Sequence, residues 1–272
     1  MPMLRLAAVL AACVTACAWG GEAVAGATKE PLVFLLFGQS NMVGRGDGAK
    51  LPQAWRMSPA NVTLVEAGRS GPPRPRGKDG AGDFGPEIAF GFELAKAYPE
   101  RPILLVKHAV GGTSLAKDWD PDRKEGLYAG LLKAYREATK DRPHTLAAAL
   151  FAQGGADARD EDDAKAYGAR LKALIERLRK DLNAPALPFL FSGARPEDPA
   201  SEDLKSRFKY LTLIREGYVA AERDVPRARM VSTVGLTYNP DGIHYDTAGQ
   251  LEFGTRYARA YLKEYAAGAK TP

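Results

Sequence analysis

Four clusters of polar residues and glycines carry the residue types that acyl transfer needs. They are Gly38-Gln39-Ser40-Asn41, "HAVGGTS" at residues 108–114, "QGGAD" at residues 153–157 and "NPDGIHYD" at residues 239–246. A serine becomes a nucleophile when a neighbouring base takes its proton and a third group orients that base. Ser40 is therefore a candidate nucleophile if one of the other clusters supplies a base.

The base can be sought among only 3 histidines. His144 precedes a candidate strand, which predicts a place at the opposite edge of the sheet from Ser40. His108 ends a candidate strand at the correct edge but has no acidic residue near it in sequence. His244 follows Asp241 by one short turn, so the carboxylate can accept from Nδ1–H and leave Nε2 free to face Ser40. The same spacing also occurs in an ordinary Asn-Pro-Asp-Gly turn with an exposed histidine.

An acyl-transfer site also needs hydrogen-bond donors that face the developing oxyanion. The candidates are the backbone N–H groups of Ser40 and of Gly111 or Gly112, and the side-chain amide of Gln153. A glycine pair is equally typical of a simple turn, and a glutamine at a strand end can cap backbone groups. On these residues alone, the choice between Gly111 and Gly112 stays open.

No cofactor or metal motif competes for these clusters. The sequence shows no P-loop, no Rossmann glycine fingerprint and no metal-ligand spacing there. The acidic run "DARDEDD" at residues 157–163 could bind a cation, but its carboxylates more simply stabilise the N-terminus of the helix that follows. We therefore expect chemistry that needs neither a metal nor a cofactor.

Short apolar runs alternate with segments of helical period along most of the chain. This alternation predicts a three-layer α/β/α sandwich with a central parallel sheet. We expect strands at 32–37, 62–66, 103–107, 145–153, 188–192 and 230–234. We expect helices at 86–98, 126–139, 164–182, 204–222 and 247–265, the last starting with a capping box at Thr247-x-x-Gln250.

The expected sheet explains why the polar clusters belong together. Ligands of an open parallel sheet bind at the carboxyl ends of its strands, and each cluster comes at or after the end of a candidate strand. The Gly- and Pro-rich stretch at residues 68–86 is predicted to be a long loop, either functional or mobile. Arg74 and Arg76 in this loop could meet an acidic sugar, although a solvated loop is the simpler interpretation.

The first 25 residues resemble a secretory signal rather than part of the fold. Arg5 precedes an apolar stretch, and Ala23-Val24-Ala25 forms an A-x-A cleavage site. We expect a secreted or periplasmic protein whose mature chain has no cysteine and no transmembrane span, with one domain at residues 30–266. Cys13 and Cys17 also each end a lipobox-like sequence, so a lipid anchor in the membrane is the alternative.

The charge pattern does not favour a nucleic-acid partner. The formal net charge is +5 and the pI is about 9.1. Lys and Arg are spread over amphipathic helices beside Asp and Glu, as on an ordinary solvated surface. No basic run with interleaved aromatic residues is present, and that pattern would be the usual mark of a nucleic-acid interface.

Taken in order, the clusters resemble the SGNH/GDSL hydrolase superfamily. The chain is more narrowly similar to its sialate O-acetylesterase-like branch, which includes carbohydrate esterase family six. The matching pieces are "FGQSNMVG", "AVGGTSLAKDW", "AQGGAD" and "DGIHYDTAGQ". The resemblance implies the SGNH-hydrolase, flavodoxin-like fold. It also implies an exported serine esterase that removes acetyl or other short acyl groups from carbohydrates.

The resemblance also assigns roles to residues. Ser40 would be the nucleophile, His244 the base and Asp241 its partner, and Gly112 and Gln153 would complete an oxyanion hole with the backbone of Ser40. Asn41 is expected near the substrate, where it and Gln39 would also position the turn. Trp119, at the end of the second block, could stack on a sugar ring, and a core tryptophan is the alternative.

One position departs from the pattern of these relatives. The third block usually carries a glutamate where this chain has Gly155, and in some relatives that glutamate helps to orient the histidine. Here His244 would depend on Asp241 alone, or on the nearby Asp157. The departure leaves two alternatives: a carbohydrate-binding relative that has lost activity, or a lipase- or thioesterase-like member that acts on longer acyl chains.

Overall fold

The computed structural model describes residues 29–77, 80–140, 142–193 and 201–266. The predicted signal sequence, with Cys13 and Cys17, lies outside the described residues. Within the described ranges, no helix combines the length and apolar character needed to cross a membrane.

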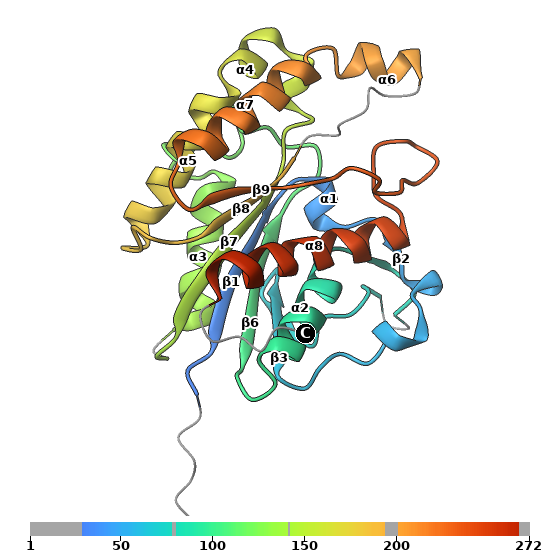
Figure 1. The fold of residues 1–272 in the computed structure, drawn as a ribbon, viewed down its shortest axis with the longest axis vertical. Coiled ribbons are helices and arrows are strands. Elements are labelled where there is room, and N and C mark those ends of the chain that lie inside the picture. Colours follow the sequence, from blue (N-terminus) through green and yellow to red (C-terminus); the bar gives the residue numbers. More distant parts are fainter. Residues whose placement is uncertain (1–28, 78–79, 141, 194–200, 267–272) are drawn as a thin grey trace, which may run out of the picture.

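A seven-stranded sheet forms the centre of the fold, with strand order β4-β3-β6-β1-β7-β8-β9 (Figure 1). Every pairing is parallel except that of β3 with β4. The strands are β1 (Leu32–Gly38), β3 (Val62–Glu66), β4 (Arg69–Gly71), β6 (Ile103–Ala109), β7 (Thr145–Ala152), β8 (Phe189–Ser192) and β9 (Ala228–Val231). A separate antiparallel pair joins β2 (Gly46–Asp47) to β5 (Asp83–Phe84).

Helices cover both faces of the sheet, as the alternating pattern predicts (Figure 1). α2 (Glu87–Ala97) and α8 (Thr247–Tyr265) pack together over one face. The other face is covered by α3 (Leu127–Thr139), α4 (Glu161–Lys165), α5 (Tyr167–Asp181) and α7 (Leu211–Asp224). The remaining elements are α1 (Ser40–Val43), α6 (Glu202–Arg207) and 3-10 turns at Gly48–Lys50, Gln53–Trp55 and Asp157–Arg159.

The central strand β1 shows why the fold has three layers. All of its residues are buried, and successive side chains of a strand point to opposite faces. Val33, Leu35 and Phe37 therefore join the core under α3 and α5. Leu32, Phe34 and Leu36 join the core under α2 and α8. A strand buried on both faces reads as a continuous apolar run, which is what the sequence shows.

Several predicted boundaries are wrong in informative ways. The helix expected at 164–182 begins earlier as α4, because Asp160 accepts from Asp163 N at 3.0 Å and caps it, and it breaks at Ala166 before α5. The helix expected at 204–222 is likewise two helices, α6 and α7. The loop expected at 68–86 contains the short strands β4 and β5.

The cap of α8 also differs from the predicted capping box. Asp246, not Thr247, is the N-cap, and its Oδ1 accepts from Gly249 N at 2.8 Å. The Thr247 hydroxyl instead accepts from Asp47 N at 2.9 Å and donates to Asp47 O at 3.1 Å. This pair ties the start of α8 to β2, which a local sequence pattern cannot reveal.

Candidate active site

Ser40 lies at the carboxyl edge of the sheet, directly after β1. The strand ends at Gly38, whose φ is +134° and where a Cβ would lie 2.1 Å from Ala152 O. A side chain would thus collide with β7, and glycine lets the two strands approach while the chain turns. Gln39 N donates to Ala152 O at 2.8 Å, and α1 then begins with Ser40, which is 9% exposed.

Asp241 and His244 form a hydrogen-bonded pair on the loop before α8. His244 Nδ1 lies 2.6 Å from Asp241 Oδ2, while Oδ1 accepts from Ile243 N at 2.8 Å and from His244 N at 3.0 Å. Partial burial raises the pKa of Asp241, but the hydrogen bonds from these backbone N–H groups and from the imidazole outweigh it, and the pKa lies below its ordinary value. An ionised carboxylate keeps the proton on Nδ1 and leaves Nε2 as the free base.

Asn41 connects the serine turn to the histidine loop. Its Oδ1 accepts from Tyr245 N at 3.1 Å and its Nδ2 donates to Ile243 O at 3.3 Å, so the amide spans the two residues that flank His244. Gln250 Nε2 donates to Asn41 O at 3.3 Å and adds α8 to the connection. Within the described ranges Ser40 and His244 share no hydrogen bond. Catalytic hydrogen bonds are commonly long in ligand-free sites and shorten when substrate binds.

The glycine pair of the second block lies beside the serine. A Cβ on Gly111 would be 3.6 Å from Ser40 Cβ and 4.0 Å from Arg45 Nη2. Gly112 has a φ of +76°, and nothing lies within 4 Å of a Cβ placed on it. Gly111 is therefore packed against the turn that carries Ser40, whereas Gly112 faces open space. The left-handed backbone at Gly112 favours glycine for conformational reasons rather than for lack of room.

Gln153 lies beneath this glycine loop and holds it in place. Its buried Nε2 donates to Thr113 O at 3.0 Å and to Asp157 Oδ2 at 2.5 Å, and its Oε1 accepts from Tyr167 OH at 3.0 Å. Both hydrogens of the amide therefore have partners within the protein. To stabilise an oxyanion, Gln153 would have to redirect one of them.

Asp157 has a different environment from the one its acidic run suggests. It is fully buried, and its oxygens accept from Leu115 N and Ala116 N, both at 2.9 Å, as well as from Gln153. Burial raises its pKa, and these hydrogen bonds act in the opposite direction. The carboxylate thus fixes the second-block loop. The alternative in which Asp157 orients His244 is wrong, because that ring pairs with Asp241.

Trp119 is a core residue, and the expectation that it stacks on substrate is wrong. Its side chain is 0% exposed, its ring packs 5.3 Å from that of Phe37 and 6.1 Å from that of Phe151, and its Nε1 donates to Thr113 Oγ1 at 3.1 Å. The tryptophan lies under the second-block loop, where its indole N–H has a partner and its rings are sealed from solvent. It shapes the loop from below.

The two other histidines do not face the candidate nucleophile. His108 packs edge-to-face on Trp119, and a Cβ on Gly130 of α3 would lie 2.7 Å from its Nε2. Burial lowers the pKa of His108. His144 donates from Nδ1 to Arg142 O at 2.9 Å and pairs through Nε2 with Tyr135 OH at 2.8 Å. It lies just before β7, at the amino-terminal edge, as predicted.

Gly155 borders a pocket beside the histidine loop. A Cβ on Gly155 would lie 3.2 Å from Gln39 Nε2 and 3.6 Å from Phe208 Cε1. When the Gln39 amide is oriented with its oxygen toward this glycine, it accepts from Gly155 N and donates to Thr113 O, each at 3.2 Å. The pocket has a volume of about 100 Å³, and its lining includes Gln39, Asn41, Gly155, Phe208, Tyr238 and Ile243.

The fold and the arrangement of this site define a class of protein. A mainly parallel α/β/α sheet carries a serine directly after its central strand and an Asp–His pair on the loop before α8. This is the SGNH-hydrolase, flavodoxin-like fold that the sequence motifs indicate.

Comparison with known proteins identifies the family. A family model described as "Carbohydrate esterase, sialic acid-specific acetylesterase" matches residues 30–263, and the chain belongs to this family. A probable carbohydrate esterase from Arabidopsis thaliana is 31% identical over 163 residues, which are 60% of this chain and 56% of that protein. The chain thus matches little more than half the length of this curated relative.

Solved structures show the same fold. A structure of an Arabidopsis thaliana protein superposes with a TM-score of 0.72 at 26% identity, covering 87% of this chain and 100% of the other. A carbohydrate acetylesterase from Xanthomonas citri superposes with a TM-score of 0.60 at 20% identity, covering 86% of this chain and 56% of the other. The second likeness concerns the fold alone.

Proposed function

We propose that this protein is a serine esterase that hydrolyses O-acetyl groups on carbohydrates through Ser40, His244 and Asp241. One observation carries the proposal. Asn41, the residue after Ser40, bonds through its side-chain amide to the backbone of Ile243 and Tyr245, the residues on either side of His244. The Asp241–His244 pair at 2.6 Å supplies an oriented base. Membership of a carbohydrate esterase family supports the substrate class.

The reaction follows from these positions. Ser40 Oγ attacks the ester carbonyl while His244 Nε2 takes its proton, and Asp241 stabilises the resulting imidazolium. The tetrahedral intermediate collapses as His244 returns the proton to the departing sugar hydroxyl. Water then attacks the acyl-enzyme by the same route and releases acetate and free Ser40. The complete cycle consumes one ester and one water, and it releases the free sugar hydroxyl and acetic acid, which ionises to acetate.

The oxyanion hole is proposed to consist of the Ser40 and Gly112 backbone N–H groups with the Gln153 amide. The backbone donors suit this role best, because they are fixed by the fold and need no rearrangement. Gln153 contributes by holding Thr113 O at 3.0 Å, which sets the path of the glycine loop, and by turning one hydrogen toward the oxyanion. Asn41 is proposed to border the bound substrate as well as to tie the two loops together.

The decisive experiment is Ser40→Ala. We expect it to abolish hydrolysis of p-nitrophenyl acetate and labelling by a fluorophosphonate, with almost no change in melting temperature, because the side chain differs by one oxygen. Undiminished turnover would contradict the mechanism. Parallel assays on acetylated xylan, O-acetylated sialic acid and an acyl-length series then define the substrate, and a preference for chains longer than acetyl would favour a lipase- or thioesterase-like enzyme.

Gly155 favours one other candidate function, a carbohydrate-binding relative without activity. Gly155 lines a pocket beside the histidine loop, and as a glycine it brings no carboxylate to that pocket. Purified protein that binds a glycan but neither reacts with a fluorophosphonate nor hydrolyses any of these esters would establish that alternative.

We also propose export, with a signal at residues 1–25 and the esterase domain at residues 30–266. The motif at Ala23-Val24-Ala25 and the cysteines Cys13 and Cys17 support two processing routes. Mass spectrometry of the mature protein distinguishes them: a chain that begins at Gly26 indicates a secreted or periplasmic protein, whereas a lipidated N-terminal cysteine indicates a membrane anchor.

A further inference from the structure

The short helix that begins with the candidate nucleophile needs support from outside itself. α1 contains 4 residues, and so short a helix is unstable alone because its nucleation costs more than its few hydrogen bonds return. The last carbonyl groups of any helix lack partners within it. Here these groups belong to Val43 and to Gly44, the residue after the helix.

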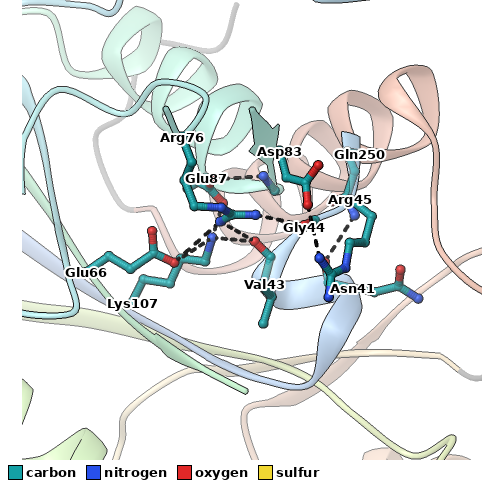
Figure 2. A network of polar contacts seen from close by, with 11 residues as sticks. Asn41, Val43, Gly44, Arg45, Glu66, Arg76, Asp83, Glu87, Lys107 and Gln250 are labelled. Atoms are coloured by element: carbon teal, nitrogen blue, oxygen red, sulfur yellow. Dashed lines mark hydrogen bonds and ion pairs between the residues drawn. The ribbon is translucent and has the colours of Figure 1, made fainter. Parts of the chain in front are cut away.

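Two cationic side chains bind these carbonyl groups (Figure 2). Lys107 Nζ donates to Val43 O at 2.9 Å. Arg76 Nη1 donates to the same oxygen at 2.9 Å, and its Nη2 donates to Gly44 O at 2.9 Å. The guanidinium thus bridges two successive carbonyl groups, because its planar fork presents two donors side by side in a fixed geometry.

Carboxylates balance the two cations and anchor them to the fold (Figure 2). Glu87 Oε2 lies 2.8 Å from Lys107 Nζ, and both side chains are almost fully buried. Glu66 Oε1 lies 3.2 Å from Lys107 Nζ and 3.8 Å from Arg76 Nη1. The other Glu87 oxygen accepts from Gly85 N at 2.9 Å. Two positive and two negative groups therefore form a neutral cluster between β3, β6 and α2.

We propose that Arg76 and Lys107 are positioning residues that fix Ser40 for attack. This inference rests on the proposed function, in which Ser40 is the nucleophile. Ser40 O accepts from Gly44 N at 2.8 Å, so a shift at the Gly44 end is transmitted through one turn to the serine. A displacement of about 1 Å at a reacting group can lower a rate by about 10².

Arg76→Ala tests the proposal because the site is accessible. The Arg76 side chain is 36% exposed, so a small cation can enter the space that the substitution leaves. We expect kcat for p-nitrophenyl acetate to fall by about 10- to 100-fold with KM within about threefold, since only the placement of the nucleophile changes. Millimolar guanidinium, far below denaturing concentrations, is expected to restore part of the lost kcat.

Arg179→Ala is the matched control. The Arg179 guanidinium also bridges backbone carbonyl groups, donating to Leu187 O at 2.9 Å and to Pro226 O at 2.7 Å. These residues precede β8 and β9, at the edge of the sheet opposite Ser40. We expect this variant to lower the melting temperature but to keep the wild-type kcat, with no effect of added guanidinium.

Two further variants distinguish a loss of positioning from a loss of folding. Arg76→Lys keeps the charge but not the fork, and we expect a folded protein whose kcat is still reduced by about tenfold. Lys107→Met combined with Glu87→Met removes the buried pair without leaving an unpaired charge, and we expect its kcat to fall in the same way. The melting temperature of each variant reports its folding independently of activity.

The outcomes distinguish the positioning role of Arg76 and Lys107 from the proposed esterase function on which it rests. Activity retained by Ser40→Ala contradicts the proposed function and this inference together. An inactive Ser40→Ala beside an Arg76→Ala variant with wild-type kcat contradicts the positioning role alone. Equal losses of kcat in Arg76→Ala and Arg179→Ala, neither rescued by guanidinium, would also refute it, because the effect would then follow stability rather than the position of the turn.

Discussion

The role of Asp241 can be tested by a substitution that keeps its shape. In Asp241→Asn, the side-chain oxygen can still accept from Ile243 N and His244 N, which lie 2.8 Å and 3.0 Å from Oδ1. The new NH₂ group then takes the place of Oδ2, which lies 2.6 Å from His244 Nδ1. Two donors cannot face each other there, so Nδ1 must lose its proton and Nε2 must carry it.

The size of the effect follows from that change of tautomer. A histidine protonated on Nε2 cannot take the proton of Ser40, and the same change in a serine protease lowers turnover by about 10⁴. That factor corresponds to about 5.4 kcal/mol in the activation free energy. We expect kcat for p-nitrophenyl acetate to fall by about 10³ to 10⁴, with the backbone of the loop and the melting temperature nearly unchanged.

Asp246→Asn is the control for this experiment. Asp246 lies on the same loop and caps α8 through Gly249 N at 2.8 Å, and asparagine caps a helix about as well as aspartate. Its kcat should stay within about twofold of wild type, since its carboxylate does not meet the imidazole. A loss of less than tenfold in Asp241→Asn would refute the assignment of Asp241 as the partner of the base.

Further substitutions examine the surroundings of the serine. Gln153→Leu removes the buried amide that bonds to Thr113 O, Asp157 Oδ2 and Tyr167 OH, and we expect a loss of about 1–3 kcal/mol in the free energy of unfolding, measured by urea denaturation. A fall of about 10² or more in kcat would separate an oxyanion role from a structural one. Gly155→Glu must displace Gln39, 3.2 Å from the new Cβ, and should lower kcat by about three- to tenfold; a rise in kcat would show that the missing carboxylate limits the enzyme. Trp119→Phe should lower the melting temperature and leave KM for an acetylated oligosaccharide unchanged, whereas a clear rise in KM would restore a substrate contact.

Much of the geometry of the candidate site could be predicted because its signals are local. A continuous apolar run predicts a strand buried on both faces, and Ser40 follows it directly. Asp241 and His244 are close in sequence, so one turn suffices to join them. The predicted capping box at Thr247 failed for the opposite reason: its hydroxyl is engaged by Asp47, 200 residues away in the chain.

The cation cluster depends on the register of β6 against β1. Lys107 lies opposite Leu36 of β1 and, by the two-residue period of a strand, shares a face with Leu105, which packs under α2. His108 must then point to the opposite face, where it meets Trp119. A lysine in the same two-residue alternation as the core residues Ile103 and Leu105 was the available signal. Its ion-pair partners Glu87 and Glu66, and the second cation Arg76, could be found only from the assembled fold.

The bridge made by Asn41 determines the order in which the parts of the candidate site come together during folding. Asn41 and Tyr245 are 204 positions apart, so a growing chain displays the serine long before the histidine loop exists. Closing so long a segment carries an entropic cost that contacts at its ends must offset, and those contacts include the packing of α8 on α2. Until the segment with the histidine loop and α8 has folded, Asn41 lacks its partner Tyr245, so the candidate site is completed only when these two distant parts of the chain pack together.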